Sequence, residues 1–376
     1  MTHCFSLYYI CKMLKKAIYL FLILIVFSSC GEFDKMLRSD NSDKKLKIAD
    51  QYFAKGNYIK ASLLYESMLE GFKYNPDVER IYFQLAECNY YLYDFYNAGY
   101  HYKTYFEYFP QGKYSEVARF RHAICGYRES LAYNLDPTYT KKSIENLQLF
   151  INYFPESYYV DSCNKFIDLS RKKLELKAYE NAYLYFNIEN YKAAITAFKN
   201  FSRDFPETDK HPNAAFYIVK SAYLLASNSI DSKKIKRLVD VSTEFMQLEQ
   251  ELKNTEFYLP ALEIKNNSEK QIENIAFEYA YSFYNNENYQ EALIAFKNFA
   301  IDYPDAEKHA NSLLYILKSS YMKAKISNEN SRRSLMDDVF AQFSELQNEL
   351  INTAYYKDAL EIKKDAERQI EKLNKN

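Results

Sequence analysis

One pattern recurs along this chain and constrains its fold more than any other feature. Each copy opens with a small residue, followed by an aromatic residue nine positions later, an alanine twelve positions later and a second aromatic residue sixteen positions later. The copies open at Ala49, Ala86 and Ala182. In two of them a proline, Pro110 or Pro206, stands twelve positions after the second alanine. Because the spacing returns in register, these segments predict one structural unit used several times.

The spacing has a physical basis in paired helices. Alanines suit the place where the helices of a pair cross closely, and the aromatic rings fill the space beside them. The proline ends the second helix, and the turn after the first helix is predicted at residues that favour turns, namely Gly56, Asn57, Asp94 and Asn190. This order resembles the tetratricopeptide repeat (TPR), a helix-turn-helix unit. With only 6 Gly and 8 Pro, the sequence does not favour β-hairpins. We therefore predict an all-α fold, a TPR superhelix of about seven helix pairs.

The C-terminal part of the chain is a duplication. The segment ENYKAAITAFKNF, which starts at Glu189, returns as ENYQEALIAFKNF 98 residues later, at Glu287. ALEIK occurs twice at the same offset. We therefore expect residues 178–273 and 276–371 to be two copies of one module, without gaps.

The repeats and the N-terminal segment divide the chain into five predicted parts. We expect a signal peptide over 1–29, a lipidated linker over 30–42, N-terminal TPR repeats over 43–156, a TPR module with a long bridging helix over 157–275, and the duplicated module over 276–376. The third repeat, Ser115 to Pro155, holds an insertion at 134–140. Long continuous helices are predicted over 157–187 and 257–285, and a last helix from Ala354.

The N-terminus resembles a targeting segment. Lys15 and Lys16 precede an apolar run of eleven residues, which is too short for a bilayer because spanning one needs about 20 residues. That length suits a secretory signal peptide. The following Ser-Ser-Cys30 resembles the lipobox of bacterial lipoproteins, which implies cleavage before Cys30 and anchoring in the lipid bilayer through acyl chains on it. A signal peptide of ordinary composition would begin at Met13, so we expect translation to start at that residue.

Composition narrows the kinds of partner and the kind of core. The chain has 39 Tyr and 27 Phe but no Trp, which predicts packed helices whose rings share a seam while the hydroxyls reach water. Core positions are expected for the aromatic residues of the repeat, namely Tyr52, Tyr65, Tyr102, Phe198 and Phe201. The net charge is −1, and Lys and Glu are interspersed, so no basic stripe for nucleic acid is predicted.

Motifs for catalysis are missing from the sequence. It has no phosphate-binding glycine loop, zinc-peptidase motif or serine-hydrolase motif. We expect no enzyme activity, cofactor or metal site. His211 and His309 occupy the same position in the two copies, and we expect both at the surface where a helix starts. Buried positions are expected for Cys88, Cys125 and Cys163. Their spacing leaves open whether Cys88 and Cys125 form a disulfide.

The inner face of each first helix provides candidates for binding. Aromatic rings exposed there would stack on a guest peptide, whereas core packing is the alternative. The repeat register selects five peptide-binding candidates, namely Asp50, Phe53, Glu87, Tyr90 and Tyr91.

From Cys30 to about Lys265 the chain resembles BamD, the TPR lipoprotein of the outer-membrane β-barrel assembly machine, in its Bacteroidetes form. Three segments support the resemblance: Gly31–Ala61, Asp136–Ser157 and Glu180–Thr208. It implies an outer-membrane protein on the periplasmic face that docks on the periplasmic domains of the membrane-embedded β-barrel assembly protein. It also implies contact with the terminal β-strand of unfolded outer-membrane barrel proteins. The family ordinarily ends near the first copy of the module, and this chain continues.

Two other classes of protein remain alternatives. An envelope TPR adaptor that coordinates cell division with outer-membrane constriction shares the aromatic-proline ending of the repeat, although such adaptors usually have a signal without a lipobox. A glycan-binding TPR lipoprotein of the SusD type would be longer and would use Trp to stack on sugars, and this sequence has none.

Overall fold

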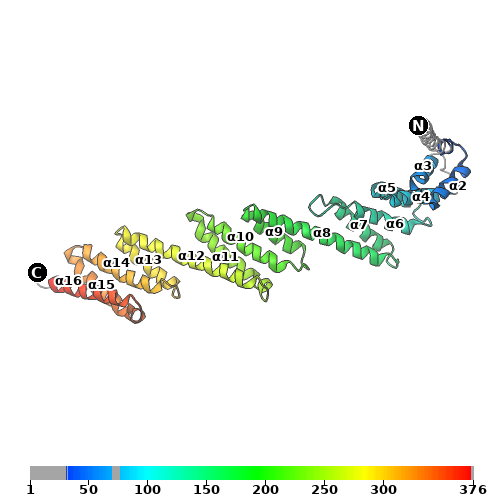
Figure 1. Ribbon diagram of the computed structural model, residues 1–376. Helices are drawn as coiled ribbons and strands as arrows, with labels where there is room; N and C mark the ends of the chain where they lie inside the picture. The colour runs from blue at the N-terminus through cyan, green and yellow to red at the C-terminus, as the bar shows by residue number, and fades with distance from the viewer. Residues whose placement is uncertain (1–30, 32, 70–76, 374–376) are drawn as a thin grey trace, which may run out of the picture. The chain divides into compact units, whose positions relative to one another are not determined.

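The computed structural model describes residues 31, 33–69 and 77–373. Over these ranges the long elements are all α-helices, and they follow one another as antiparallel neighbours (Figure 1). Their bounds are α2 (Ser42–Ala54), α3 (Tyr58–Leu69), α4 (Val78–Tyr91), α5 (Phe95–Tyr108), α6 (Ser115–Glu129), α7 (Thr138–Tyr153), α8 (Val160–Asn187), α9 (Tyr191–Asp204), α10 (His211–Ser227), α11 (Asp231–Leu252), α12 (Tyr258–Asn285), α13 (Tyr289–Asp302), α14 (His309–Ile326), α15 (Glu329–Leu350) and α16 (Tyr356–Leu373).

In the described part of the chain these helices form seven successive pairs, from α2/α3 to α14/α15, and α16 follows the last pair. The predicted all-α TPR fold is thereby confirmed. The long helices predicted over 157–187 and 257–285 are α8 and α12, which begin three residues and one residue later than expected. The insertion at 134–140 is shorter than predicted, because its last three residues already belong to α7.

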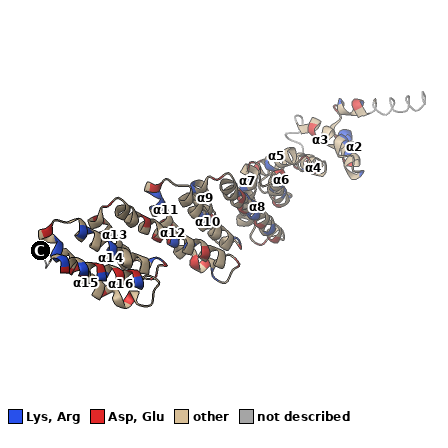
Figure 2. Ribbon diagram, turned by 60° about the vertical axis from the view of Figure 1, so that its left-hand side comes forward, with Lys and Arg blue, Asp and Glu red and all other residues tan. Residues whose placement is uncertain are grey.

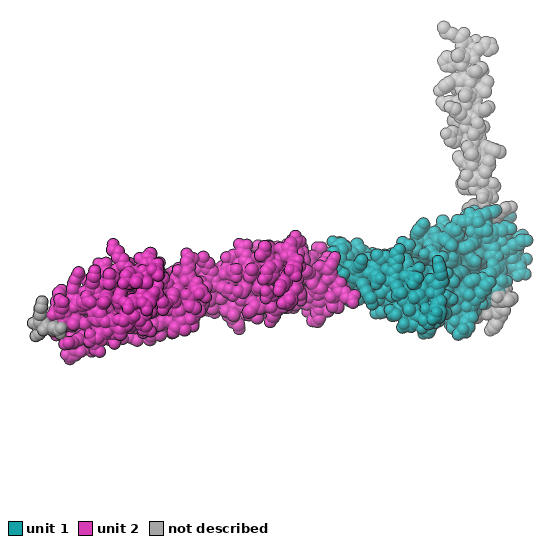
Figure 3. All heavy atoms as spheres, turned by 90° about the horizontal axis from the view of Figure 1, so that it is seen from below, with its two compact units in different colours: residues 1–177 teal, residues 178–376 magenta. Residues whose placement is uncertain are grey.

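The chain divides into two compact units, residues 1–177 and 178–376 (Figure 3). The boundary lies within α8, the helix that the sequence predicted as a bridge. Unit 1 therefore contains α2 to α7 and the first part of α8, and unit 2 contains the rest of α8 and the helices up to α16.

Close crossings of paired helices rest on alanine, as the repeat pattern predicts. Every crossing alanine has an exposed fraction of 0%, so a larger side chain there would have to displace a neighbouring helix. These residues are Ala49, Ala61, Ala86, Ala98, Ala182, Ala194, Ala280 and Ala292. The aromatic positions beside them are filled as expected, with Tyr65, Tyr102 and Phe198 each 0% exposed.

The turn within each of these pairs has one backbone conformation. Seven positions after the first alanine, a residue adopts the left-handed region, which ends the helix. The φ angles are 75° at Gly56, 62° at Tyr93, 60° at Glu189 and 59° at Glu287. In the first three turns the next side chain, Asn or Asp, accepts a hydrogen bond from the backbone N–H three residues later, at 3.1 to 3.3 Å. The sequence predicted the first three of these turns from Gly56, Asn57, Asp94 and Asn190.

The duplication is visible in the helix bounds. Helices α13, α14 and α15 each begin 98 residues after α9, α10 and α11. The last helix, α16, begins 98 residues after α12, so the two copies match without a gap. We call residues 178–273 copy 1 and residues 276–371 copy 2.

Residues of both charge signs are mixed along the helices (Figure 2). No helix in the described ranges has the length and apolar character needed to cross a membrane.

Candidate functional site

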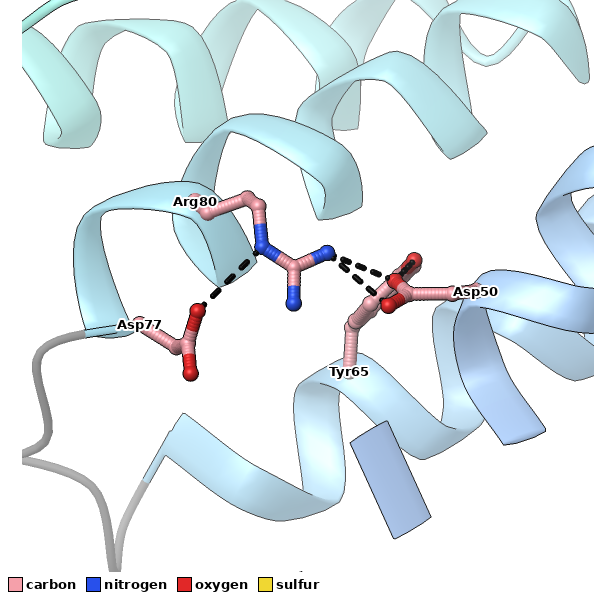
Figure 4. Close-up of polar contacts among 4 residues, drawn as sticks. All are labelled: Asp50, Tyr65, Asp77 and Arg80. Atoms are coloured by element: carbon pink, nitrogen blue, oxygen red, sulfur yellow. Dashed lines mark hydrogen bonds and ion pairs between the residues drawn. The ribbon is translucent and has the colours of Figure 1, made fainter. Parts of the chain in front are cut away.

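A carboxylate holds the first helix pair of unit 1 to the helix that follows it (Figure 4). The Tyr65 hydroxyl donates a hydrogen bond to Asp50 Oδ1 at 2.7 Å, and Arg80 Nη1 lies 2.9 Å from both oxygens of Asp50. Asp77 Oδ1 lies 3.4 Å from Arg80 Nε. Burial, followed by the hydrogen bond to Asp50, raises the pKa of Tyr65 because the phenolate is disfavoured. Asp50 thus joins α2, α3 and α4.

The same arrangement returns one repeat later around Glu87, whose exposed fraction is 8%. The Tyr102 hydroxyl donates a hydrogen bond to Glu87 Oε1, and Arg121 Nε lies 3.8 Å from that oxygen. The guanidinium carbon of Arg121 lies 4.2 Å from the centre of the Tyr90 ring. Burial, followed by the charge of Glu87, raises the pKa of Tyr102. We call the Glu87, Tyr102 and Arg121 group the polar junction.

Both tyrosines contradict one expectation from composition. The hydroxyls of Tyr65 and Tyr102 do not reach water, because each is fully buried and donates to a carboxylate fifteen residues earlier. Each of these carboxylates belongs to the residue directly after the first alanine of its repeat. The fifteen-residue spacing can be seen in the sequence once the two repeats are aligned on their alanines.

An aromatic cluster lies between α2, α3 and α4, the same three helices that Asp50 joins. Phe53 and Tyr58 have ring centres 5.4 Å apart, and Tyr91 stacks on Tyr58 at 4.8 Å. The Tyr91 side chain is 42% exposed, so one side of this cluster is accessible.

The structure therefore separates the five peptide-binding candidates into two groups. Asp50, Glu87 and Tyr90 contact neighbouring helices, and burial makes Glu87 unavailable on an open inner face. Phe53 and Tyr91 belong to the partly open aromatic cluster. Peptide binding by any of them stays a prediction.

Two adjoining cavities between α5, α6 and α7 form a site that sequence reasoning missed. Their volumes are about 200 Å³ and about 270 Å³, and both are lined by Lys103, His122, Lys142 and Asn146. We call this pair the α5–α7 groove. Arg119 adds a third cation, and Glu129 lines one end. Aromatic side chains with exposed fractions above 60% also line it, namely Tyr96, Tyr100 and Tyr153.

Gly99 opens the floor of this groove. The corresponding residues of unit 2, each directly after the second alanine, are Ile195 and Leu293. The Gly99 carbonyl accepts a hydrogen bond from Nδ1 of His122 at 2.9 Å, and Nε2 of His122 lies 3.3 Å from the Asn146 amide nitrogen. Burial lowers the pKa of His122. A glycine in place of an aliphatic residue was the available sequence signal for the groove.

The structure also shows where the cysteines and histidines discussed above lie. Cys88, Cys125 and Cys163 are buried free thiols, so the first two are not bonded to each other. Burial raises the pKa of Cys88 and of Cys125 to about 12 and that of Cys163 to about 11. His211 and His309 begin α10 and α14. Among the described residues no cluster of His, Cys, Asp and Glu could hold a metal ion.

Cys30 and the predicted signal peptide lie outside the described residues, so the structure does not test lipidation.

A family model described as outer membrane lipoprotein, YfiO, matches residues 39–238, which is more than half of the chain. The chain belongs to the YfiO family of outer membrane lipoproteins. The family is BamD-like, so the match confirms the general resemblance predicted from the sequence. It also confirms the predicted location at the outer membrane. The match starts just before α2 and ends inside α11, so the end of copy 1 and the whole of copy 2 lie beyond it.

Solved structures similar to this YfiO-family protein include TPR proteins. A tetratricopeptide repeat protein from Parabacteroides merdae is 11% identical, with 86% of this chain and 99% of that chain covered and a TM-score of 0.26. The C-terminal part of a TPR repeat-containing protein from Cytophaga hutchinsonii is 15% identical, with 84% and 99% covered and a TM-score of 0.22. Likenesses this low carry no argument about function. No curated protein matches the chain significantly.

Proposed function

We propose that this YfiO-family protein is a lipid-anchored scaffold on the periplasmic face of the outer membrane, where it helps to assemble and insert β-barrel proteins. The observation that carries the proposal is the family match over residues 39–238. The resemblance to the Bacteroidetes form of BamD supports two partners, the periplasmic domains of the membrane-embedded β-barrel assembly protein and unfolded outer-membrane barrel proteins. A stack of helix pairs is suited to holding such partners, since it offers extended surfaces.

The α5–α7 groove is the surface that we propose for unfolded barrel segments. Strands of outer-membrane barrels have aromatic residues at both membrane interfaces, and Tyr96, Tyr100 and Tyr153 offer rings on which these can stack. Lys103 and Lys142 line the same groove and would attract a carboxylate of the segment. Phe53 and Tyr91 are a second proposed contact, because their cluster is partly exposed.

A charge reversal tests the groove. We expect Lys142→Glu to weaken binding of a fluorescent peptide copied from the terminal strand of a barrel protein by about fivefold, since a rim charge contributes about 1 kcal/mol. Lys141→Glu is the matched control, because Lys141 is the exposed neighbour that does not line the groove. Equal weakening by both variants would show only a general charge effect and would remove the groove from the proposal.

The anchor has its own test. We expect Cys30→Ala to abolish labelling by a palmitate analogue and to leave an uncleaved or soluble precursor, because the acyl chains that supply the membrane affinity need this cysteine. Normal membrane retention of the variant, with palmitate labelling no different from the parent, would contradict the lipid anchor.

Depletion of the protein tests the function as a whole. We expect folded outer-membrane barrels to fall before any defect in septation appears, and the membrane-embedded assembly protein to copurify with the chain from detergent extracts. A primary division defect with normal barrel levels would instead favour the envelope adaptor that coordinates division.

A further inference from the structure

Copy 2 has an open groove between α13, α14 and α15 with a cavity of about 680 Å³. Leu313 and Ile316 form its buried floor, with exposed fractions of 2% and 3%, and Ile301 stands at its edge with 75% exposed. Its polar groups are Lys297, Gln342 and Glu345, together with His309 and Glu349, whose Nε2 and Oε2 lie 3.0 Å apart. We call this the copy 2 groove.

Copy 1 has an ion pair at the corresponding position. There Lys199 Nζ of α9 lies 2.5 Å from Glu244 Oε1 of α11. The residues 98 positions later are Lys297 and Gln342, so the lysine is kept and its carboxylate is replaced by an amide. Within the described part of the chain Lys297 has no ion-pair partner, and the buried Gln342 Oε1 has no hydrogen-bond donor. Copy 2 thus leaves a cation and an acceptor available.

The surroundings of this lysine have also become more apolar. Arg203 of copy 1, which pairs with Asp204 at 3.0 Å, is replaced by Ile301. Ser202 and Ala215 of copy 1 correspond to Ala300 and Leu313. The replacement puts an exposed aliphatic side chain at the edge of the cavity, where copy 1 has a charged one.

The two copies also differ in where α11 and α15 carry a carboxylate. Gln247 of copy 1 corresponds to Glu345, which lies about one helical turn beyond Gln342 on α15. Within the described ranges Glu345 makes no ion pair, either with Lys297 or with another residue. Apart from the paired His309 and Glu349, the copy 2 groove therefore presents Lys297 on α13 and Glu345 on α15 as charged groups that have no ion-pair partner in the described ranges.

We propose that the copy 2 groove binds a partner protein through a short segment that places an aliphatic or aromatic side chain against Ile301 and Leu313. In the segment, a carboxylate faces Lys297, a basic side chain faces Glu345, and an amide N–H donates to Gln342 Oε1. Anionic lipid would complement only the lysine, whereas a polypeptide supplies both charges and the amide donor. The groove lies outside residues 39–238, so this interaction is separate from the proposed barrel assembly.

Photo-crosslinking in living cells tests the proposal, with benzoylphenylalanine placed at position 300 of the full-length chain. Position 202, the equivalent site in copy 1, is the matched control. We expect a protein adduct from position 300 and none from position 202. The crosslinked segment, mapped by mass spectrometry, should contain an apolar residue with an acidic and a basic residue near it.

Restoring the copy 1 residues should close the groove. We expect Ile301→Arg with Gln342→Glu to lower the adduct from position 300 about tenfold, because the apolar contact is lost and Lys297 becomes paired within the chain. Circular dichroism of this double variant should match that of the parent, since both residues are already accepted in copy 1. Lys297→Glu should also lower the adduct, and exchange of the facing acidic residue of the partner for Lys should restore it.

Several results would overturn the proposal. These are no adduct from position 300, an equal adduct from position 202, an adduct with lipid or with a second copy of this chain, or no response to the double variant. Failure here would leave the barrel-assembly proposal intact, because depletion and copurification report on that function separately.

Discussion

Unit 1 and unit 2 close the same three-helix junction with different chemistry. In unit 1 the positions are Glu87, Tyr102 and Arg121, joined by a hydrogen bond and an ion pair. Unit 2 has aromatic rings at the same spacings in both copies, in copy 1 as Tyr183, Phe198 and Tyr217, and in copy 2 as Tyr281, Phe296 and Tyr315. Their ring centres lie 5.1 to 5.5 Å from the ring of the third member. One repeat geometry therefore accepts a polar or an aromatic solution.

The difference teaches that similar positions need not be equally tolerant of change. A buried carboxylate depends on its partners, because removing one of them leaves a charge without compensation. Stacked rings depend mainly on buried area and ring geometry, so each contributes more independently. Unit 1 should consequently be the more fragile of the two when a single junction residue is altered.

The largest expected effect comes from removing the cation of the polar junction. We expect Arg121→Met to destabilise unit 1 by about 3 kcal/mol, because Glu87 then stays buried without its counter-charge. Hydrogen–deuterium exchange of peptides from each unit measures this separately for the two units. Tyr217→Phe is the matched change in unit 2 and should cost much less. Similar losses in both would show that the two junctions do not differ in the way described.

A complete exchange of the junction sharpens the comparison. We expect the triple variant Glu87→Tyr, Tyr102→Phe and Arg121→Tyr to lie within about 1 kcal/mol of the parent, since replacing a whole buried ion pair by packed apolar groups is often neutral or stabilising. The free energy of unfolding of unit 1 is the measurement. A triple variant as unstable as Arg121→Met would mean that the surroundings in unit 1 do not accept the aromatic solution.

A smaller difference between the units should appear in acid. His122 is the counterpart of Ile218 and Ile316 in unit 2, and burial lowers its pKa below the usual 6.5. Lys103 and Lys142 lower the pKa further, whereas the hydrogen bond to the Gly99 carbonyl and the charge of Glu107 raise it. Unfolding therefore takes up a proton as the pH falls below 6.5, and this contribution to stability is lost on the acid side. Neither isoleucine titrates.

We expect hydrogen–deuterium exchange to show loss of protection around α5–α7 between pH 7.5 and pH 5.5, beyond the change measured in copies 1 and 2. His122→Ile should reduce the excess loss in unit 1. An unchanged pH response in that variant would exclude burial of His122 as the cause.

The smallest expected effect concerns the left-handed turn residues. Gly56 adopts its φ of 75° without strain, whereas Glu189 and Glu287 hold φ near 60° with a side chain. We expect Glu189→Gly to stabilise unit 2 by about 0.5 kcal/mol, since relief of strain slightly exceeds the added entropy of the unfolded chain. Gly56→Ala in unit 1 should have the opposite sign. Thermal denaturation measures both, and a destabilised Glu189→Gly variant would contradict the argument.

The repeat pattern predicted most of the fold because its determinants are local and periodic. Ala98 and Ala194 reveal the helix crossings directly, since only small residues are accepted there. The position of the long helix α12 in the sequence was likewise predictable from the duplication. The left-handed conformation of Tyr93 and Glu189 was not, because it follows from the geometry of the turn and not from the residue type.

Less of the candidate site was predictable. The role of Glu87 depends on Tyr102 and Arg121, which approach from two other helices and lie 15 and 34 residues away. Single-sequence reasoning placed Glu87 on a face of one helix and could not supply these partners. The α5–α7 groove depends on a missing side chain at Gly99, and such a gap acquires meaning only from the residues around it.

The buried thiols bear on how the chain survives outside the cytoplasm. Disulfide exchange proceeds through the thiolate, and a pKa of about 12 leaves roughly one thiolate in 10⁵ at neutral pH. Cys88 and Cys125 are also enclosed by packed helices, so an oxidant meets neither a reactive nor an accessible sulfur. Folding is therefore the step that protects these cysteines from mixed disulfides, and a repeat that opens locally exposes them to oxidation.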